Sequence, residues 1–399
     1  MHVLVTASAR FAITSDGLLW TSNASLGYSF WTRYLDVFDE AHLFVRGQPV
    51  SAPPIGWNVA SGPGIKLVPL PDFQGAGGFV KNYVNIKKAV RKALVNAEAI
   101  QLRLPCHIGG EVGRELPSQR PYGVEVVGDP YDLFAPGAIQ HPLRPFFRWW
   151  SPRQLQRQCA GACAAAYVTE HILQNRYPPA LEAFSTHYSS IELPDSAIVN
   201  FPRPPYQGRR TFTLLTVGSL AQLYKAPDTL IDAVAVCVRE GLDLKLILVG
   251  DGNYRAELEA RTARLGLGER VLFCGQLPSS EAVRVQLDRA DLFILPSRQE
   301  GLPKAMIEAM ARGLPCIGST VGGIPELLPP EDMVPPNDVT ALALKIREVV
   351  TNPERMADMS SRNLEKAKEY RDEVLRKRRI AFYCYVREKT KAWLQTPGS

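Results

Sequence analysis

Two glutamates with seven residues between them stand in the segment SRQEGLPKAMIEAMARGLP, Ser297–Pro315. Glu300 lies in a glycine-containing loop directly after the apolar run Asp291–Ser297, which is typical of a buried strand. Glu308 lies in a segment of helical periodicity, about two turns further along at a rise of ~1.5 Å per residue. Carboxylates so placed would contact different parts of one ligand, with Glu308 accepting hydrogen bonds from a diol that the loop carboxylate does not reach.

A purely structural interpretation of the two glutamates stays open. Glu308 and Arg312 are four residues apart, which on a helix allows an ion pair. Glu300 would then be an ordinary loop residue.

The start of this helix favours a negatively charged ligand. Pro303 is expected in the first helical turn and Gly313 just after the last one. The N–H groups of Gly301 and Leu302 precede the helix and point, with its dipole, towards whatever lies in front of it.

A lysine occupies a second strand-to-helix loop. The run Thr211–Val217 predicts a strand, Gly218 allows a tight turn, and a helix is expected from Pro227. Lys225 lies between them, where a phosphate would meet both a cation and a helix N-terminus. Taken alone, Lys225 is better explained as a surface lysine.

The next turn, in LKLILVGDGNYRAEL (Leu244–Leu258), resembles a dinucleotide-binding fingerprint but places Arg255 where the third glycine belongs. This mismatch disfavours a nicotinamide dehydrogenase. Glycines there still let a nucleotide approach the backbone, and the strand end FCGQLP exposes main-chain groups to a flat base. The residues expected to bind the nucleotide in these two turns are Gly250, Gly252, Gln276 and Leu277.

The strands and helices that position these residues can be predicted from the sequence, because apolar runs alternate with segments of helical periodicity. Strand-helix alternation predicts parallel sheets covered by helices, hence an α/β protein of two Rossmann-like doubly wound domains facing across a cleft. We expect residues 1–205 and 206–371 to form these domains, joined by the linker Asn200–Arg210, and a helix at ~372–399 to pack back on the first. The strands expected are His2–Ala7, Ala41–Val45, Ile65–Pro69, Ala99–Leu104, Gly123–Gly128, Ala165–Thr169, Thr211–Val217, Leu244–Val249, Val271–Cys274, Leu292–Leu295 and Pro315–Ser319.

Composition excludes several classes of protein. The chain has 399 residues, of which 46% are apolar and 22% charged, a mixture typical of globular domains. No apolar run approaches the ~18–20 residues that span a bilayer, and the start lacks the basic region of a signal peptide, so we expect a cytoplasmic protein. The seven cysteines are scattered and odd in number, which favours neither a disulfide framework nor a metal site.

The net charge of +6 is concentrated in two segments. Lys81–Leu94 predicts a basic amphipathic helix, and RPFFRWWSPR, Arg144–Arg153, mixes arginines with four aromatic residues. Both fit the anionic inner face of a membrane. A solvated charged face and a buried aromatic cluster explain them equally well. A nucleic-acid partner is disfavoured, because no recognition signature accompanies the charge.

An ordered set of motifs over Thr211–Leu328 resembles the retaining glycosyltransferases of family four. These motifs are VGSLAQLYK, LILVGDG, FCGQLP, EGLPKAMIEAMARGLPCI and VGGIPEL. The resemblance implies a GT-B fold and a nucleoside diphosphate sugar as donor. It also implies that Lys225 binds the donor diphosphate, that Glu300 contacts the transferred sugar, and that Glu308 holds the ribose hydroxyls.

The chain departs from the family at two places. Many members have an arginine where Ser219 stands, so one positive charge for the phosphates is missing. Many also have a histidine after the fifth strand, where this chain has Gly128 and Asp129. Asp129 either orients the acceptor hydroxyl or caps a turn before a proline. The first half resembles the family only loosely, and the aromatic residues of Tyr28–Leu35 fit an acceptor site or the core.

The resemblance and the residues together predict a metal-independent, retaining hexosyltransferase for a glycan, lipid-linked or small-molecule acceptor, active in cell-surface polysaccharide or glycoconjugate synthesis, and without a cofactor. The alternatives are a GT-B nucleotide-sugar epimerase and an inactive nucleotide-sugar-binding protein. Lys225, Glu300 and Asp129 are the catalytic candidates. Donor-binding candidates are Gly218, Ser219, Gly250, Gly252, Gln276, Leu277, Gly301, Leu302, Pro303 and Glu308.

Overall fold

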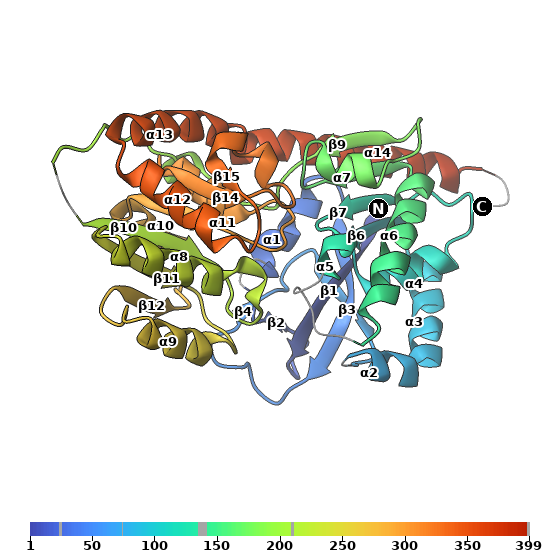
Figure 1. Ribbon diagram of the computed structural model, residues 1–399. Helices are drawn as coiled ribbons and strands as arrows, with labels where there is room; N and C mark the ends of the chain where they lie inside the picture. Colours follow the sequence, from blue (N-terminus) through green and yellow to red (C-terminus); the bar gives the residue numbers. More distant parts are fainter. Residues whose placement is uncertain (24–25, 74, 135–141, 209–210, 397–399) are drawn as a thin grey trace. The chain divides into compact units, whose positions relative to one another are not determined.

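The computed structural model describes residues 1–23, 26–73, 75–134, 142–208 and 211–396 (Figure 1). The chain divides into two compact units. Unit 1 comprises residues 1–128, 151–188 and 376–399, and unit 2 comprises residues 129–150 and 189–375. The boundary expected at residue 205 differs from this division, because 129–150 and 189–205 group with unit 2. Of the expected linker, residues 209 and 210 lie outside the described residues.

Unit 1 is built on a parallel sheet in the strand order β5-β3-β1-β6-β7-β8-β9. Two short strands, β2 and β4, add to it in antiparallel fashion. The strands are β1 (His2–Ile13), β2 (Leu19–Thr21), β3 (Glu40–Pro49), β4 (Asn58–Val59), β5 (Ile65–Leu70), β6 (Ala99–Leu104), β7 (Gly123–Val126), β8 (Ala164–Tyr167) and β9 (Phe184–His187).

Unit 1 also contains helices. They are α1 (Tyr28–Thr32), the 3-10 helix η2 (Arg33–Asp36), α2 (Gly75–Lys81), α3 (Tyr83–Asn96), α4 (His107–Glu115), α7 (Ile172–Arg176), α6 (Arg144–Gly161), which runs from a segment of unit 2 into unit 1, and α14 (Asp372–Leu394).

Continuous apolar runs made the parallel strands predictable. Val3, Leu4 and Val5 of β1 are all buried, as expected for a strand covered on both faces. The sequence did not predict β2 or β4, because two or three residues are too few to show a pattern. It also missed β9, whose sequence FSTH has one apolar residue and no buried one, so that the apolar run of a covered strand is missing. Between β2 and β3 the chain forms the short α1, followed directly by η2.

A buried carboxylate joins α14 to the sheet of unit 1. Glu125 on β7 accepts hydrogen bonds from the hydroxyls of Tyr34, Tyr188 and Tyr383 and from the Arg103 guanidinium, at 2.6–2.9 Å. Burial alone would raise the pKa of Glu125, but Arg103 and the three hydroxyls bring it below its usual value. Phe30, Trp31 and Tyr34 are core residues, whereas Tyr28 of the same segment is half-buried. The acceptor-side role of this segment stays a prediction.

Unit 2 contains a fully parallel sheet in the order β12-β11-β10-β13-β14-β15. Counted along the chain this is 3-2-1-4-5-6, the order of the doubly wound Rossmann sheet. The strands are β10 (Phe212–Val217), β11 (Leu244–Val249), β12 (Val271–Gly275), β13 (Leu292–Leu295), β14 (Cys316–Ser319) and β15 (Met333–Val334).

The helices of unit 2 pack partly in pairs, with α8 against α12 and α11 against α13. Leu230, Ile231 and Val234 of α8 are buried in the main apolar core of the unit. The helices are α5 (Pro130–Leu133), η3 (Asp195–Ala197), η4 (Leu223–Lys225), α8 (Pro227–Arg239), α9 (Arg255–Arg264), α10 (Ser280–Arg289), α11 (Lys304–Ala311), η5 (Ile324–Glu326), η6 (Pro330–Asp332), α12 (Val339–Val350) and α13 (Pro353–Lys368).

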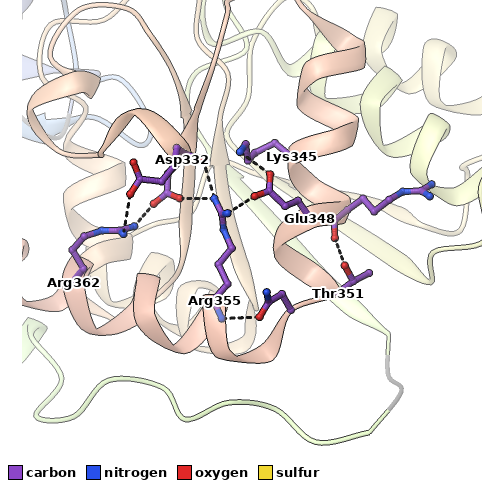
Figure 2. Close-up of polar contacts among 9 residues, drawn as sticks. Asp332, Lys345, Glu348, Thr351, Arg355 and Arg362 are labelled. Carbon is purple, nitrogen blue, oxygen red and sulfur yellow. Dashed lines mark hydrogen bonds and ion pairs between the residues drawn. The ribbon is translucent and has the colours of Figure 1, made fainter.

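A network of charged side chains joins η6, α12 and α13 (Figure 2). The buried carboxylate of Asp332 contacts the guanidinium groups of Arg355, at 3.1 Å, and Arg362. Arg355 also pairs with Glu348, which in turn pairs with Lys345 at 2.7 Å. The network fixes the two helices that follow the last strand, at a place that the motifs did not single out.

Candidate active site

The reversal of strand order in unit 2 lies between β10 and β13, which are neighbours in the sheet. The chain passes from β10 to β11 on one side, and β13 continues to β14 on the other. Loops at the carboxyl ends of β10 and β13 therefore lead to opposite sides, and this is the place at which open α/β sheets bind ligands. The first of these loops carries Lys225 and the second carries Glu300.

Lys225 and Glu300 meet. The Lys225 Nζ lies 2.5 Å from Glu300 Oε1, and the side chains are 20% and 6% exposed. Ser297 Oγ donates to the same carboxylate oxygen at 2.7 Å, while Ser319 Oγ donates to the Ser297 carbonyl at 2.6 Å. Two buried serines thus orient Glu300, and neither was singled out from the sequence.

Glycines bring the loops after β10, β11 and β12 into backbone contact. The Gly250 N–H donates to the Gly275 carbonyl, and the Gly218 N–H to the Val249 carbonyl, both at 2.9 Å. A Cβ on Gly250 would lie 1.9 Å from the Gly218 carbonyl oxygen, and one on Gly252 would lie 2.1 Å from the Ala221 nitrogen. The φ angles of Gly250 and Gly252, +139° and +155°, also exclude ordinary side chains. These two glycines are required by the close approach of the loops, whether or not a nucleotide is bound.

A further glycine, Gly322, packs closely against the backbone of Glu300. A Cβ on Gly322 would lie 2.2 Å from the Glu300 carbonyl oxygen, and the neighbouring Gly323 N–H donates to the Gly301 carbonyl at 2.6 Å. The motif VGGIPEL therefore packs its two glycines against the loop that carries the first glutamate.

The helix after this loop begins almost as expected. Pro303 is the N-cap of α11 rather than a residue of its first turn, and Leu302 and Pro303 are buried. At the other end Gly313 has a φ of +64°, and the Leu314 N–H donates to the Ala309 carbonyl at 3.1 Å, which confirms the predicted glycine stop.

Glu308 lies half-buried on α11 and does not form the ion pair allowed by its spacing from Arg312. Arg312 instead binds Asp288, with its Nε 2.6 Å from Oδ1. Within the described part of the chain, the Glu308 carboxylate has neither a hydrogen-bond nor an ion-pair partner. Burial raises the pKa of Glu308, and the Lys304 and Arg284 charges only partly oppose this.

The loop that carries Lys225 is held by Arg298, which the sequence analysis missed. Its guanidinium forms a bidentate pair with Asp228 at 2.9 and 2.8 Å and donates to the Leu223 carbonyl at 2.6 Å. These partners lie about seventy positions earlier in the chain, so no local pattern could reveal them. Ser219, which stands where many family members have an arginine, is exposed. Its hydroxyl accepts a hydrogen bond from the Ala221 N–H at 3.2 Å.

The other candidates have simpler surroundings. Gln276 is exposed and Leu277 half-buried, in the loop between β12 and α10. Asp129 is buried, and its carboxylate caps α5 by accepting from the Tyr131 N–H at 2.8 Å. The structure thus shows the capping role of Asp129, and its proposed role towards an acceptor stays a prediction. Within the described ranges, no three His, Cys, Asp or Glu residues are grouped so as to hold a metal ion.

Comparison with known proteins identifies the domain that carries this site. Residues 207–366 match the family model described as Glycosyl transferases group 1. This part of the chain is a group 1 glycosyltransferase domain.

The relatives of this glycosyltransferase domain include proteins of polysaccharide synthesis. Protein CapJ of Staphylococcus aureus is 25% identical over 368 residues, which cover 88% of this chain and 90% of CapJ. The putative colanic acid biosynthesis glycosyltransferase WcaL of Escherichia coli K12 is 32% identical over 154 residues, about a third of each chain (36% and 37%).

Solved structures confirm the fold of the whole chain. Anabaena HepE, in complex with UDP and glucose, covers 99% of each chain with a TM-score of 0.61 at 15% sequence identity. Together with the parallel sheets of both units, this likeness shows the GT-B fold of two Rossmann-like domains. How the two domains face each other stays an expectation.

Proposed function

We propose that the protein is a retaining glycosyltransferase that moves a sugar from a nucleoside diphosphate sugar to a glycan, lipid-linked or small-molecule acceptor in polysaccharide or glycoconjugate synthesis. The observation that carries this proposal is the Lys225–Glu300 contact at the strand-order reversal of a group 1 glycosyltransferase domain. The similarity to WcaL, which is named a putative colanic acid biosynthesis glycosyltransferase, and the UDP and glucose bound by HepE support it.

Sugar transfer needs positive charge where the leaving diphosphate develops negative charge. In the proposed complex the Lys225 ammonium and the N–H groups of Gly301 and Leu302 supply it, so the chemistry requires no metal ion. Glu300 contacts the transferred sugar, and Glu308 accepts hydrogen bonds from the ribose hydroxyls. The Glu308 carboxylate, which has no hydrogen-bond partner among the residues that the structure describes, is suited to that role, because a ligand diol would provide such hydrogen bonds.

The Lys225–Glu300 pair also indicates what donor binding must change. Without a ligand, the cation and the carboxylate neutralise each other at 2.5 Å. A diphosphate that binds Lys225 would compete with Glu300 and release its carboxylate towards the sugar. Binding of a nucleoside diphosphate and exposure of Glu300 would thus be one event.

A binding and turnover screen tests the proposal. Sugars linked to UDP, GDP, ADP, CDP and dTDP are tested for a rise in melting temperature and for slow donor hydrolysis. We expect one of them to stabilise the wild-type protein, Glu300→Gln to lose turnover by about 100-fold or more while still binding the nucleotide, and Lys225→Met to weaken binding.

The control is Lys245→Met, since Lys245 is an exposed lysine near the amino end of β11, away from the loop edge. The proposal is wrong if no donor stabilises the protein, or if Glu300→Gln turns over like the wild type.

We further propose that the basic face of α2 and α3 rests on an anionic membrane surface. Val80 and Val84 are 72% and 78% exposed, beside the exposed lysines 81, 88 and 92. Lys87 and Arg91 instead bind Glu115 on α4, at 3.0 and 2.6 Å, so only part of the predicted basic helix is available. In the second basic segment, Phe146 and Trp149 are half exposed. No helix in the described ranges is long and apolar enough to cross a bilayer.

Vesicle sedimentation tests this surface. Wild-type protein should bind vesicles containing phosphatidylglycerol but not pure phosphatidylcholine, and Lys88→Glu with Lys92→Glu should abolish binding. Replacing Lys366 and Lys368 of α13 by glutamine is the control and should change nothing. Equal binding by all three proteins would rule the surface out.

A further inference from the structure

Arg298 uses every N–H group of its side chain. Its Nε donates to Asn337 Oδ1 at 2.5 Å, Nη1 to the Leu223 carbonyl at 2.6 Å and Asp228 Oδ1 at 2.9 Å, and Nη2 to Asp228 Oδ2 at 2.8 Å and Thr229 Oγ1 at 3.2 Å. The side chain is 15% exposed. An arginine has five such donors, and here all five have partners.

Arg298 and its partners connect three loops at one edge of the sheet, together with the first turn of α8. Leu223 lies in η4, the 3-10 turn after β10 that ends with Lys225. Arg298 itself lies after β13, two residues before Glu300, and its backbone N–H donates to the Tyr224 carbonyl at 2.7 Å. Asn337 follows β15 and has a φ of +65°, so a residue in a rarely populated conformation orients its side chain towards Arg298. One side chain therefore connects the loops that carry the proposed cation and the proposed carboxylate.

We infer that Arg298 is a positioning residue: it fixes the η4 turn so that Lys225 is held where the donor diphosphate binds. The inference rests on the proposed function, because it acts through Lys225.

Arg298 is not a substitute for the family arginine that Ser219 replaces. Its donors are all occupied, and its charge is compensated by Asp228 in the first turn of α8. The pair has an electrostatic purpose of its own. An uncompensated Asp228 at that helix start would repel an incoming diphosphate, and Arg298 neutralises it.

An arginine is needed here for its shape as well as its charge. A planar guanidinium can bind a carboxylate with two parallel hydrogen bonds and still donate sideways to a carbonyl, which a lysine ammonium does not reproduce. Arg298→Lys should therefore fail to restore the η4 turn, although it keeps the charge.

A double-mutant cycle on nucleotide binding tests the inference. The probe is whichever of UDP, GDP, ADP and CDP the wild-type protein binds most tightly, and the readout is its affinity relative to the corresponding nucleoside, which isolates the diphosphate contribution. Lys225→Met and Arg298→Met are each expected to lower this ratio by about 10-fold or more, and the double variant to be within about 3-fold of Lys225→Met alone.

The matched control is Arg261→Met. Arg261 forms an equivalent bidentate pair with Asp232, on the same helix α8, with one bond at 2.7 Å. It should leave the ratio unchanged and add nothing to the effect of Lys225→Met. If Arg298→Met does not fold, Arg298→Lys replaces it in the cycle and should lower the ratio to a similar extent.

The outcomes separate the inference from the proposal beneath it. Additive effects of Arg298 and Lys225, or a wild-type ratio for Arg298→Lys, would overturn the positioning role while leaving the donor site intact. An unchanged ratio for Lys225→Met would overturn the donor site, and the role of Arg298 with it.

Discussion

Among single residues, Glu308 is held at a cost to the folded chain. Burial raises its pKa, so the folded state binds its proton more tightly than the unfolded state does. Stability from this group therefore falls as pH rises from the ordinary glutamate pKa, about 4.3, through the raised value. A carboxylate kept ionised at this cost, with a free face, is suited to binding a ligand.

Glu308→Gln should therefore move stability and binding in opposite directions. At neutral pH we expect a higher melting temperature, because the buried charge is removed, and a roughly 10-fold weaker affinity for the ribonucleoside diphosphate, because a charged acceptor is lost. In the wild type, the preference for a ribonucleotide over its 2′-deoxy analogue should decrease as pH is lowered. Differential scanning fluorimetry and titration calorimetry measure both effects.

Glu257→Gln provides the control for this prediction. Glu257 is an exposed carboxylate on α9, and its replacement should change neither quantity. A lower melting temperature for Glu308→Gln, or unchanged binding, would show that the carboxylate serves the fold instead.

At this scale the sequence singled out the two residues that form the ion pair but not the residues that support them. Lys225 and Glu300 follow from motif and loop position. Ser297 and Arg298, which orient them, lie within the opening motif. Ser297 donates to Glu300 three positions away, whereas the Arg298 partners Asp228 and Leu223 are remote in the sequence. Arg298 meets Asp228 through tertiary folding alone, and no periodicity encodes such a contact.

At the scale of elements, the loops at the sheet edge depend on glycines more than the nucleotide motif requires. The prediction that Gly250 and Gly252 allow a ligand to approach the backbone is incomplete. The space that a side chain would occupy at each glycine is already taken by the backbone of a neighbouring loop. The parallel strands themselves were predictable from apolar runs. The two-residue β15, like β2 and β4, was too short to leave such a pattern.

Three glycine-to-alanine substitutions separate crowding from backbone strain. Gly250→Ala should destabilise unit 2 by about 2–4 kcal/mol, since both a positive φ and the Gly218 carbonyl oppose a Cβ. Gly266→Ala should lower the free energy of unfolding by about 1 kcal/mol, because Gly266 has a φ of +71° but no atom near the added Cβ. Gly268→Ala should change it by close to zero, because Gly268 has neither a positive φ nor a close neighbour. Urea denaturation gives the three values, and a Gly250→Ala cost no larger than that of Gly266→Ala would contradict the crowded loop junction.

At the scale of the whole molecule, unit 1 is assembled from both ends of the chain. The C-terminal helix α14 buries Phe382, Tyr383 and Val386 in this unit. The sequence suggested this return only because α14 has no strand to accompany it. The hydrogen bond from Tyr383 to Glu125 spans 258 positions and had no local signal.

Tyr383→Phe should destabilise unit 1 by about 1–2 kcal/mol, because it removes one donor from a buried carboxylate without leaving a cavity. Tyr385→Phe is the matched control on the same helix, since Tyr385 contributes a ring stacked on Phe184 at 5.3 Å. Hydrogen exchange of β7 amides reports the effect within unit 1. Equal protection in the two variants would mean that the hydroxyl contributes nothing.

This arrangement of segments also bears on biosynthesis. A ribosome releases β7 long before α14, so the nascent chain carries Glu125 and Arg103 for hundreds of residues without Tyr383. Unit 1 therefore reaches its complete set of contacts only after the last helix has left the exit tunnel. A chain that stops before residue 376 would contain all of unit 2 but an incomplete unit 1, which would stay open to chaperones and proteases.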